Sequence, residues 1–508
     1  MLVWTLWISF LGAAAAALLS PRRKAEARWL ALAAASAGLT LGLWGWWAYD
    51  VGAGGYQLGN GEGLPWIPQI GVGIRFGVDG FSLPLVILTG IIGVTGVLYS
   101  WNIETRVNEF FALYLLLLGG VYGVFLSVDL FLLVVFYEIA IVPKYFLIAI
   151  WGSTRKEHGA MKLVLYSFAG GALILLGLAG IAFAAEPAAR SFDLERLAAA
   201  NFSAAFQAWA FPAFFLGFGI LAGLWPFHTW APTGHVAAPT AASMLLAGVV
   251  MKLGSYGCLR VAIGLFPGAL GATFLGVPGF WRGTLTALAA VNILYGAMVA
   301  LVQRDFKFVI GYSSVSHMGF VLLGLMTLNP WGLSGAALQM FSHGIIAGLL
   351  FAVVGRLVYD RAHTRELDEL GGLGRAAPFA AGVFILGGLA SMGLPGMSGF
   401  FAELLVLIGT WKAFAWALLP VGVGMAVTVV YILRTIHAAF FCERPSDAER
   451  WKGLPPITLP EKAASLILVA LLFLVGLYPP VLLNMMDRAA HQFLDRVKQT
   501  TPVHLARP

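Results

Sequence analysis

Charged residues are scarce in this 508-residue chain: Asp, Glu, Lys and Arg make up 11% of it, against about a quarter in soluble globular proteins. Apolar residues make up 60%. Apolar runs of roughly 20 residues, enough to cross a bilayer, cover most of the length. These observations exclude a soluble enzyme with a small tail and predict an all-α polytopic membrane protein that forms a single transmembrane domain.

Cysteine is also nearly absent. Cys258 and Cys442 lie in different apolar segments and are too few for a disulfide framework, an iron–sulfur cluster or a Cys-rich zinc site. No dinucleotide-binding fingerprint follows a predicted strand. His228 and His235, seven residues apart with no carboxylate or thiol near them, are a weak metal signal. We therefore expect no cofactor and no metal in this chain, and any redox chemistry belongs to partners.

The first apolar run, from Leu2 to Leu19, has no basic residue ahead of it and a basic cluster behind it. This order is the reverse of a secretory signal peptide, so we expect a retained helix with its N-terminus outside. The stretch 191–202 is compatible with a short interfacial helix. With the N-terminus outside, most Lys and Arg residues fall on the inner side of the membrane. The net charge of +7 therefore does not indicate nucleic-acid binding. Fourteen transmembrane helices are predicted, at 2–19, 28–48, 82–100, 110–127, 129–150, 160–184, 208–230, 239–263, 282–302, 308–327, 332–358, 378–410, 412–440 and 463–483.

Two of these helices carry helix-breaking residues in the middle. Pro226 and Pro232 interrupt helix 7 in WPFHTWAPTGH, and Pro395 with two glycines interrupts helix 12 in GLPGMSGF. Broken helices in corresponding positions of two halves indicate an ion pathway at the bilayer midplane, although prolines also merely bend packed helices. We therefore predict two five-helix repeats. The predicted divisions are 1–109 (helices 1–3), 110–263 (repeat one), 282–440 (repeat two) and 463–483 (helix 14).

Ionisable residues deep inside the apolar runs are the best functional signal, since each costs roughly 2.5–3.5 kcal/mol at a helix centre. Burial moves the pKa of carboxylates up and that of amines down, toward neutral pH, where histidine already titrates. Such a set suits a proton relay. The alternatives are neutralised pairs that hold helices together, lysines that snorkel to the interface, and histidines that satisfy backbone groups at a break. The candidates are Glu138, Lys144, His228, His235, Lys252, His317, His343 and Glu403.

Five segments between roughly residues 80 and 440 resemble one protein family, the antiporter-like membrane subunits of respiratory complex I, and among them the subunit M group. The segments are FYEIAIVPKYFLIAIWG, PFHTW followed by APTAASMLLAGVVMKLGSYGCLR, RDFKFVIGYSSVSHMGFVLLG, QMFSHGIIAGLLF with LVYDRAHTRELDELGGLG, and SMGLPGMSGFFAELL. The resemblance implies fourteen helices, two inverted five-helix repeats and a proton-translocating channel without a redox centre.

The resemblance also implies roles for single residues. Glu138 matches the helix-5 glutamate, Lys252 the central helix-8 lysine and Glu403 the acid that ends the path in helix 12. Subunits L and N and the multisubunit antiporter proteins usually have a lysine at that last position, so glutamate favours subunit M. His317 and His343 match the polar positions of helices 10 and 11, and Lys307 matches the basic residue of the D-x-K segment.

The chain departs from this family in helix 7. The helix-7 lysine, which is the partner of the helix-5 glutamate in the family, is Leu221 here; Gly223 replaces a proline and Thr233 an aspartate. Either a basic residue elsewhere supplies this charge, or the proton channel has one ionisable group fewer. Lys144 is a candidate replacement, although it lies about 9 Å along the axis from Glu138 and some 120° round the helix. We expect its amine to point inward, within water-mediated reach of Glu138.

The sequence therefore predicts a proton-translocating subunit of a complex I-like NAD(P)H or ferredoxin:quinone oxidoreductase in the bacterial inner membrane. Its expected partners are protons, lipid, and subunits of the L and N type on either side. The alternatives are a subunit of a cation/proton antiporter or membrane-bound hydrogenase, and a structural spacer that does not pump. The electron donor, the quinone, the proton stoichiometry and any movement of sodium are left open.

Overall fold

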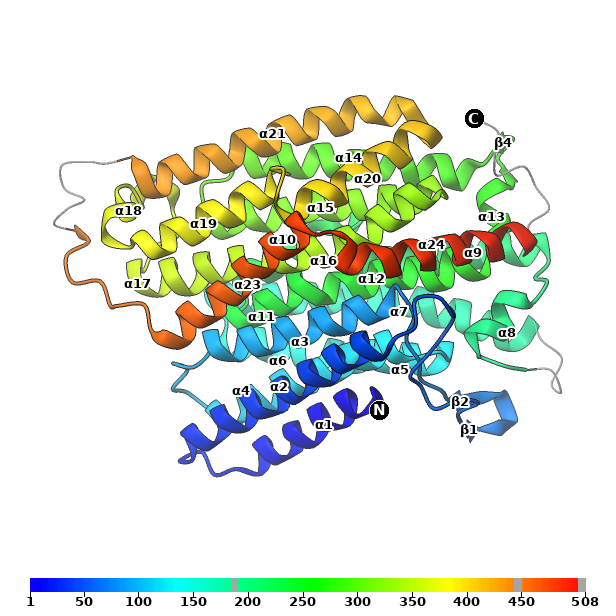
Figure 1. Cartoon of the computed structure of the whole chain (residues 1–508), viewed down its shortest axis with the longest axis horizontal. Coiled ribbons are helices and arrows are strands. Elements are labelled where there is room, and N and C mark those ends of the chain that lie inside the picture. The colour runs from blue at the N-terminus through cyan, green and yellow to red at the C-terminus, as the bar shows by residue number, and fades with distance from the viewer. Residues whose placement is uncertain (185–189, 443–449, 501–508) are drawn as a thin grey trace.

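The computed structural model describes residues 1–184, 190–442 and 450–500, which form a bundle of helices that run side by side (Figure 1). Among these described residues, twelve helical segments are long and apolar enough to cross a membrane, and α1 (Val3–Leu18) and α19 (Pro378–Ser391) are shorter apolar helices. One of the twelve, Ser398–Phe441, contains the second half of the predicted helix 12 and the predicted helix 13, and α19 is the first half of the interrupted helix 12. The structure therefore agrees with the prediction of about fourteen transmembrane helices.

The remaining helices vary from single turns to 29 residues. In chain order they are α2 (Lys24–Ala48), α3 (Ser82–Tyr99), α4 (Val107–Leu126), α5 (Leu130–Ile139), α6 (Ile141–Trp151), α7 (Lys156–Ala184), α8 (Leu194–Ala199), α9 (Ala204–Ala222), α10 (Trp230–Ala237), α11 (Thr240–Leu245), α12 (Met251–Gly257), α13 (Gly268–Gly271), α14 (Phe280–Val302), α15 (Phe306–Thr327), α16 (Pro330–Ala352), α17 (Asp360–Ala362), α18 (Leu373–Ala376), α20 (Ser398–Phe414), α21 (Leu418–Ile436), α23 (Leu459–Leu477) and α24 (Pro480–Thr500).

Two short antiparallel strand pairs lie outside the helices in the part of the chain that the structure describes. β1 (Leu64–Ile67) pairs with β2 (Val72–Ile74) with an irregularity after Pro65, and β3 (Thr273–Phe274) pairs with β4 (Val277–Pro278). The first pair and α8 lie at one end of the bundle, and α17 and α18 lie at the opposite end (Figure 1). Arg75 links β2 to α8 through ion pairs with Asp193 and Glu195. The short helix expected within 191–202 is therefore present as α8.

The centre of the bundle is formed by the segments Thr240–Ile263 and Pro330–Ala362, which are buried over their whole apolar stretch. The first contains α11 and α12 and the second contains α16 and α17, each with π-helical turns between or beside the α-helices. Large apolar side chains on the outer helices remain exposed, as expected of a surface that meets lipid or other membrane subunits. Polar side chains within these buried stretches are therefore shielded from lipid.

The predicted last helix, 463–483, is wrong in extent. α23 ends at Leu477, and α24 begins at Pro480, because two consecutive prolines cannot continue the hydrogen-bond ladder of the preceding helix. α24 is amphipathic, and one of its faces packs on the bundle through residues such as Phe493, whose ring meets Phe81 at 6.4 Å. Because α24 contains charged residues and no long apolar run, the pattern of apolar runs did not predict this helix.

Candidate functional site

The predicted break of helix 12 is present, and it leaves Glu403 facing the bundle interior. α19 ends at Ser391 and α20 begins at Ser398, and between them Gly393 and Gly396 have left-handed backbone conformations, with φ of 69° and 90°. Glu403 is 4% exposed. A Cβ on Gly393 would lie 2.8 Å from Oε2 of Glu403. Glycine at 393 therefore provides both the turn and the space for the carboxylate.

Four ionisable side chains from four helices form a continuous row through the interior. Nζ of Lys252 on α12 lies 2.8 Å from Nδ1 of His343 on α16. The His343 ring stacks on that of His317 on α15, with centroids 5.6 Å apart and 7° between the planes. Nε2 of His317 lies 3.5 Å from Oε1 of Glu403. All four residues are at most 4% exposed, so the row is shielded from lipid along its length.

A π-helical turn provides the second partner of Lys252. Leu246–Val250 is π-helical, and Nζ of Lys252 donates a hydrogen bond to the carbonyl oxygen of Ala247 within that turn. A π-turn shifts the i→i−4 bonding pattern, so that backbone carbonyl groups become available to side chains. The Lys252 amine thus has a backbone acceptor on its own helix and an imidazole acceptor on α16.

The surroundings of His317 accommodate a proton on each ring nitrogen. Nδ1 lies 2.8 Å from the carbonyl oxygen of Ser313, and Nε2 lies 3.0 Å from that of Ser391. Carbonyl oxygens only accept hydrogen bonds, so both contacts are satisfied when both nitrogens carry protons. The resulting imidazolium would lie beside the Glu403 carboxylate. This arrangement can hold a proton between Lys252 and Glu403.

Glu138 and Lys144 form a second buried group. Oε1 of Glu138 is buried without a hydrogen-bond partner and lies against α7, where a Cβ on Gly171 would be 2.5 Å away. Lys144 is 1% exposed, and its Nζ has no hydrogen-bond partner among the described residues. The two charges interact electrostatically, but no direct ion pair joins them in the described part of the chain. Lys144 is thus buried inside the bundle rather than placed among lipid head groups.

Helix 5 is interrupted, which corrects the continuous helix predicted for 129–150. α5 ends at Ile139 and α6 begins at Ile141. Pro143 explains the interruption, because its ring clashes with the carbonyl group four residues earlier and it has no N–H to donate. Glu138 therefore lies at the end of a half-helix, and Lys144 lies in the first turn of the next.

The break of helix 7 is present and includes Pro226, as predicted, whereas Pro232 lies outside it. α9 ends at Ala222, Gly223 is left-handed with φ of 81°, and α10 begins at Trp230. Pro232 does not break the helix, because it lies in the first turn of α10, where a missing N–H is tolerated. Asn292 on α14 stabilises the break: its amide donates to the carbonyl oxygen of Gly223 at 3.1 Å, and its side-chain oxygen accepts from the Trp225 N–H at 2.6 Å.

The two histidines of this break lie in different surroundings. His228 is 2% exposed, and its ring lies 5.2 Å from that of Tyr295 and 6.3 Å from that of Tyr312. His235 is fully buried beside the ring of Phe351, 5.1 Å away. Neither histidine has a hydrogen-bond partner on either ring nitrogen among the described residues. The structure therefore does not join them to the row by direct hydrogen bonds.

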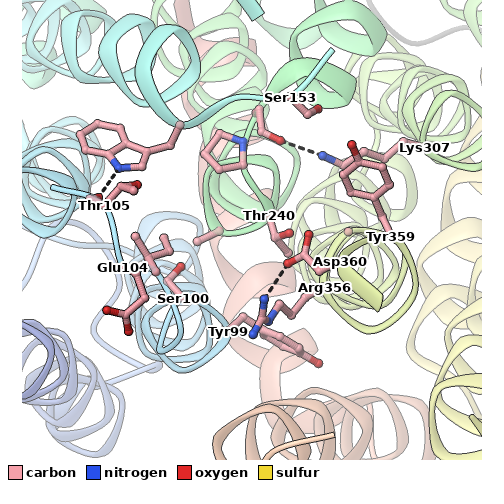
Figure 2. Close-up of a pocket in the computed structure, with 16 residues that line it drawn as sticks. Tyr99, Ser100, Glu104, Thr105, Ser153, Thr240, Lys307, Arg356, Tyr359 and Asp360 are labelled. Carbon is pink, nitrogen blue, oxygen red and sulfur yellow. Dashed lines mark hydrogen bonds and ion pairs between the residues drawn. The ribbon is translucent and has the colours of Figure 1, made fainter. Parts of the chain in front are cut away.

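Lys307 connects the candidate site to a cavity at the end of the bundle predicted to be the inner one. The cavity has a volume of about 260 Å³ and is lined by Tyr99, Arg356, Asp360 and Lys307, among others (Figure 2). Nζ of Lys307 donates to the carbonyl oxygen of Ala238 at 2.7 Å, and Arg356 pairs with Asp360 at 2.7 Å (Figure 2). The charges of Lys307 and Lys252 both act on His235. Lys307 thus reaches from this cavity to the backbone of residues 236–238, which directly follow His235.

Sequence reasoning missed several residues of the site. Asn292 orders the break of helix 7, the Ser391 carbonyl oxygen contacts His317, and Lys162 on α7 reaches Thr233 of α10. Asn292 carried a signal, since it is a polar amide inside an apolar run. The Ser391 contact is made by the backbone and has no sequence signal. Lys162 lies near a helix end, where a lysine is usually a snorkelling residue.

Comparison with known proteins gives a consistent family. Residues 127–428 match the family described as NADH:quinone oxidoreductase/Mrp antiporter, TM. The chain is 38% identical over 489 residues to the NAD(P)H-quinone oxidoreductase chain 4 1 of Synechococcus sp. (strain JA-3-3Ab), covering 94% of this chain and 90% of the relative. It is 35% identical over 512 residues to the NADH-quinone oxidoreductase subunit M of Pseudomonas aeruginosa, covering 97% of each.

Solved structures agree with the fold. A chain of respiratory complex I from Thermus thermophilus with bound NADH superposes with a TM-score of 0.86 at 28% identity, covering 98% of this chain and 100% of that chain. A chain of the Mrp complex from Dietzia sp. DQ12-45-1b superposes with a TM-score of 0.83 at 21% identity, covering 98% of each. At that identity the second likeness concerns the fold alone.

Proposed function

Because the chain belongs to the NADH:quinone oxidoreductase and Mrp antiporter family of membrane subunits, we propose that it carries protons as the subunit M of a quinone oxidoreductase complex. It is an integral membrane protein, and its relatives are subunits of NAD(P)H- or NADH-quinone oxidoreductases. The observation that carries the proposal is the row Lys252–His343–His317–Glu403, because its members are consecutive buried groups that can each bind and release a proton.

The chemistry of the row suits movement of protons in the membrane plane. An amine, two imidazoles and a carboxylate each gain and lose a proton without covalent change, and adjacent members lie within a hydrogen bond, a ring stack or a close polar contact. Lys252 is the central store and Glu403 the end of the row. His343 and His317 carry the proton between them. Lys307 and His235 connect Lys252 with the cavity of about 260 Å³ at the predicted inner end.

Glu138 and Lys144 act, in this proposal, as a switch for the row. A carboxylate near an amine favours the charged amine, and moving the carboxylate's charge away favours release of the proton. Glu138 lies at the end of the half-helix α5, next to the interruption at Ala140. We infer that Glu138, Lys144 and Lys252 belong to one functional half, 110–263, and that the other members of the row belong to the second half, 282–440.

The partners follow from the same assignment. The exposed apolar side chains of the outer helices suit contact with lipid and with neighbouring membrane subunits of the L and N type on either side. The bacterial inner membrane is the expected location. Glutamate at position 403 favours this assignment over a cation/proton antiporter subunit, in which the resemblance would place a lysine.

The test is proton pumping by the intact complex. The complex carrying Glu403→Gln is reconstituted in liposomes, and dye-reported acidification is measured together with quinone reduction. We expect normal assembly and a loss of pumping of roughly tenfold or more, since a positioned proton donor contributes about 10²–10⁴-fold in rate. Glu109→Gln is the matched control, because Glu109 is an exposed carboxylate paired with Arg106 on the surface. Normal pumping by Glu403→Gln would favour a structural spacer.

A further inference from the structure

A lysine outside the row contacts the break of helix 7. Lys162 is half-buried in the second turn of α7, and its Nζ donates to Oγ1 of Thr233 on α10 at 3.3 Å. No carboxylate lies within ion-pair distance of this amine in the described ranges 1–184, 190–442 and 450–500. Its charge acts on His228, which is 2% exposed and has no hydrogen-bond partner on either ring nitrogen in that part of the chain.

The contact belongs to a regular ladder of hydroxyl groups. One turn further along α7, the Tyr166 hydroxyl lies 3.0 Å from Oγ1 of Thr229, which is one turn before Thr233. Thr233 in turn donates to the carbonyl oxygen of Thr229 at 2.9 Å. Residues four apart lie on one face of a helix, so α7 and the broken helix meet through two matched polar pairs. The ladder leads from Lys162 to the residue next to His228.

A second cavity at the same end of the bundle as Lys307 reaches this ladder. It has a volume of about 560 Å³, and Thr233 is part of its wall. The wall also carries the ionisable side chains of His158, Asp305, His363 and Glu366, together with Tyr359 and the arginines Arg155 and Arg365. This cavity reaches Thr233, whereas the cavity of about 260 Å³ reaches Lys307.

We propose that Lys162 carries protons between this cavity and His228 at the break of helix 7. A proton leaves a hydronium ion in the cavity and binds the neutral amine of Lys162, which becomes an ammonium group. The ammonium then releases a proton, through water along the hydroxyl ladder, to a ring nitrogen of His228, and the amine is neutral again. This inference rests on the proposed function, since it adds an inlet to the same proton pathway.

Thr233 is essential to the proposed proton transfer through Lys162. A hydroxyl accepts a hydrogen bond from the Lys162 amine in either protonation state of the lysine, whereas a carboxylate at 233 would hold the ammonium in its charged form. The resemblance to the antiporter-like family places an aspartate at this position. The chain therefore has a lysine whose proton is not retained by an ion pair.

Two variants of the intact complex test the inference in liposomes. Lys162→Arg keeps a donor for Thr233, but a guanidinium does not release its proton. Thr233→Asp strengthens the contact and retains the proton on Lys162. We expect both variants to assemble normally and to pump roughly tenfold less or worse, a part of the 10²–10⁴-fold typical of a positioned proton donor. If Lys162 only anchors α7 to α10, both variants keep the anchor and pump normally, which would overturn the inference.

The controls separate this inference from the proposed function. Lys412→Arg alters a lysine outside the pathway, which lies over the Trp331 ring at 5.4 Å; we expect this variant to pump normally. Glu403→Gln is measured in parallel. Normal pumping by Glu403→Gln would overturn the proposed function, whereas normal pumping by Lys162→Arg together with loss in Glu403→Gln would overturn the inlet alone.

Discussion

His343 lies between Lys252 and His317 in the row, so replacing it interrupts the row in the middle. Its Nδ1 lies 2.8 Å from Nζ of Lys252, and its ring stacks on that of His317 at 5.6 Å. His343→Leu removes both functions with little change in volume. His343→Gln keeps an acceptor for Lys252 but cannot carry a proton.

The size of the effect follows from the contacts of Lys252. Without His343, its amine keeps only the carbonyl oxygen of Ala247 as a hydrogen-bond acceptor among the described residues. A hydrogen bond to a charged group contributes about 1.5–3 kcal/mol, and roughly 1.4 kcal/mol corresponds to a factor of ten. We therefore expect His343→Leu to lower the population of protonated Lys252 by about ten- to a hundredfold, and pumping with it.

The assay is dye-reported acidification of liposomes that contain the complex, with quinone reduction and the yield of assembled complex measured on the same preparation. His491→Gln is the control, because His491 is a half-exposed histidine of α24. We expect His343→Gln to remain impaired, since the imidazole itself carries the proton. Recovery by His343→Gln would show that only the hydrogen bond matters. Normal pumping by an assembled His343→Leu complex would refute the row as a pathway.

Three further predictions use the same assay. Glu138→Gln keeps the shape of the side chain and removes its charge, so we expect intact assembly and a strong fall in proton pumping or in coupled quinone reduction. Normal pumping together with normal quinone reduction would show that Glu138 does not act as a switch. Lys144→Met should impair pumping and a second change, Leu221→Lys, should restore part of it; if Lys144→Met pumps normally, the channel works without this amine. Gly393→Ala places a Cβ 2.8 Å from Oε2 of Glu403 at a residue with φ of 69°, so we expect a loss of about 1–2 kcal/mol of stability and weaker pumping. An unchanged melting temperature of the complex would contradict the strain at Gly393.

Helix positions were largely predictable, because a transmembrane helix is specified by a local run of apolar residues. The break of helix 12 at Gly393–Gly396 was equally local, since glycine and proline act on their own turn. The errors have local causes too. Pro143 interrupts helix 5 at Ala140, and the charges of α24 concealed an amphipathic helix.

The sequence by itself also indicated which residues carry the chemistry, since an ionisable group inside an apolar run is expensive wherever the chain places it. It did not determine which of these groups meet. Lys252 and His343 lie 91 residues apart in the chain, and the distance between their nitrogens depends on how α12 and α16 pack. Lys162 resembled an ordinary lysine near a helix end until the packing of α7 on α10 placed it against Thr233. Burial cost is a property of one segment, whereas a proton pathway is a set of distances between segments, and only the tertiary structure sets those distances.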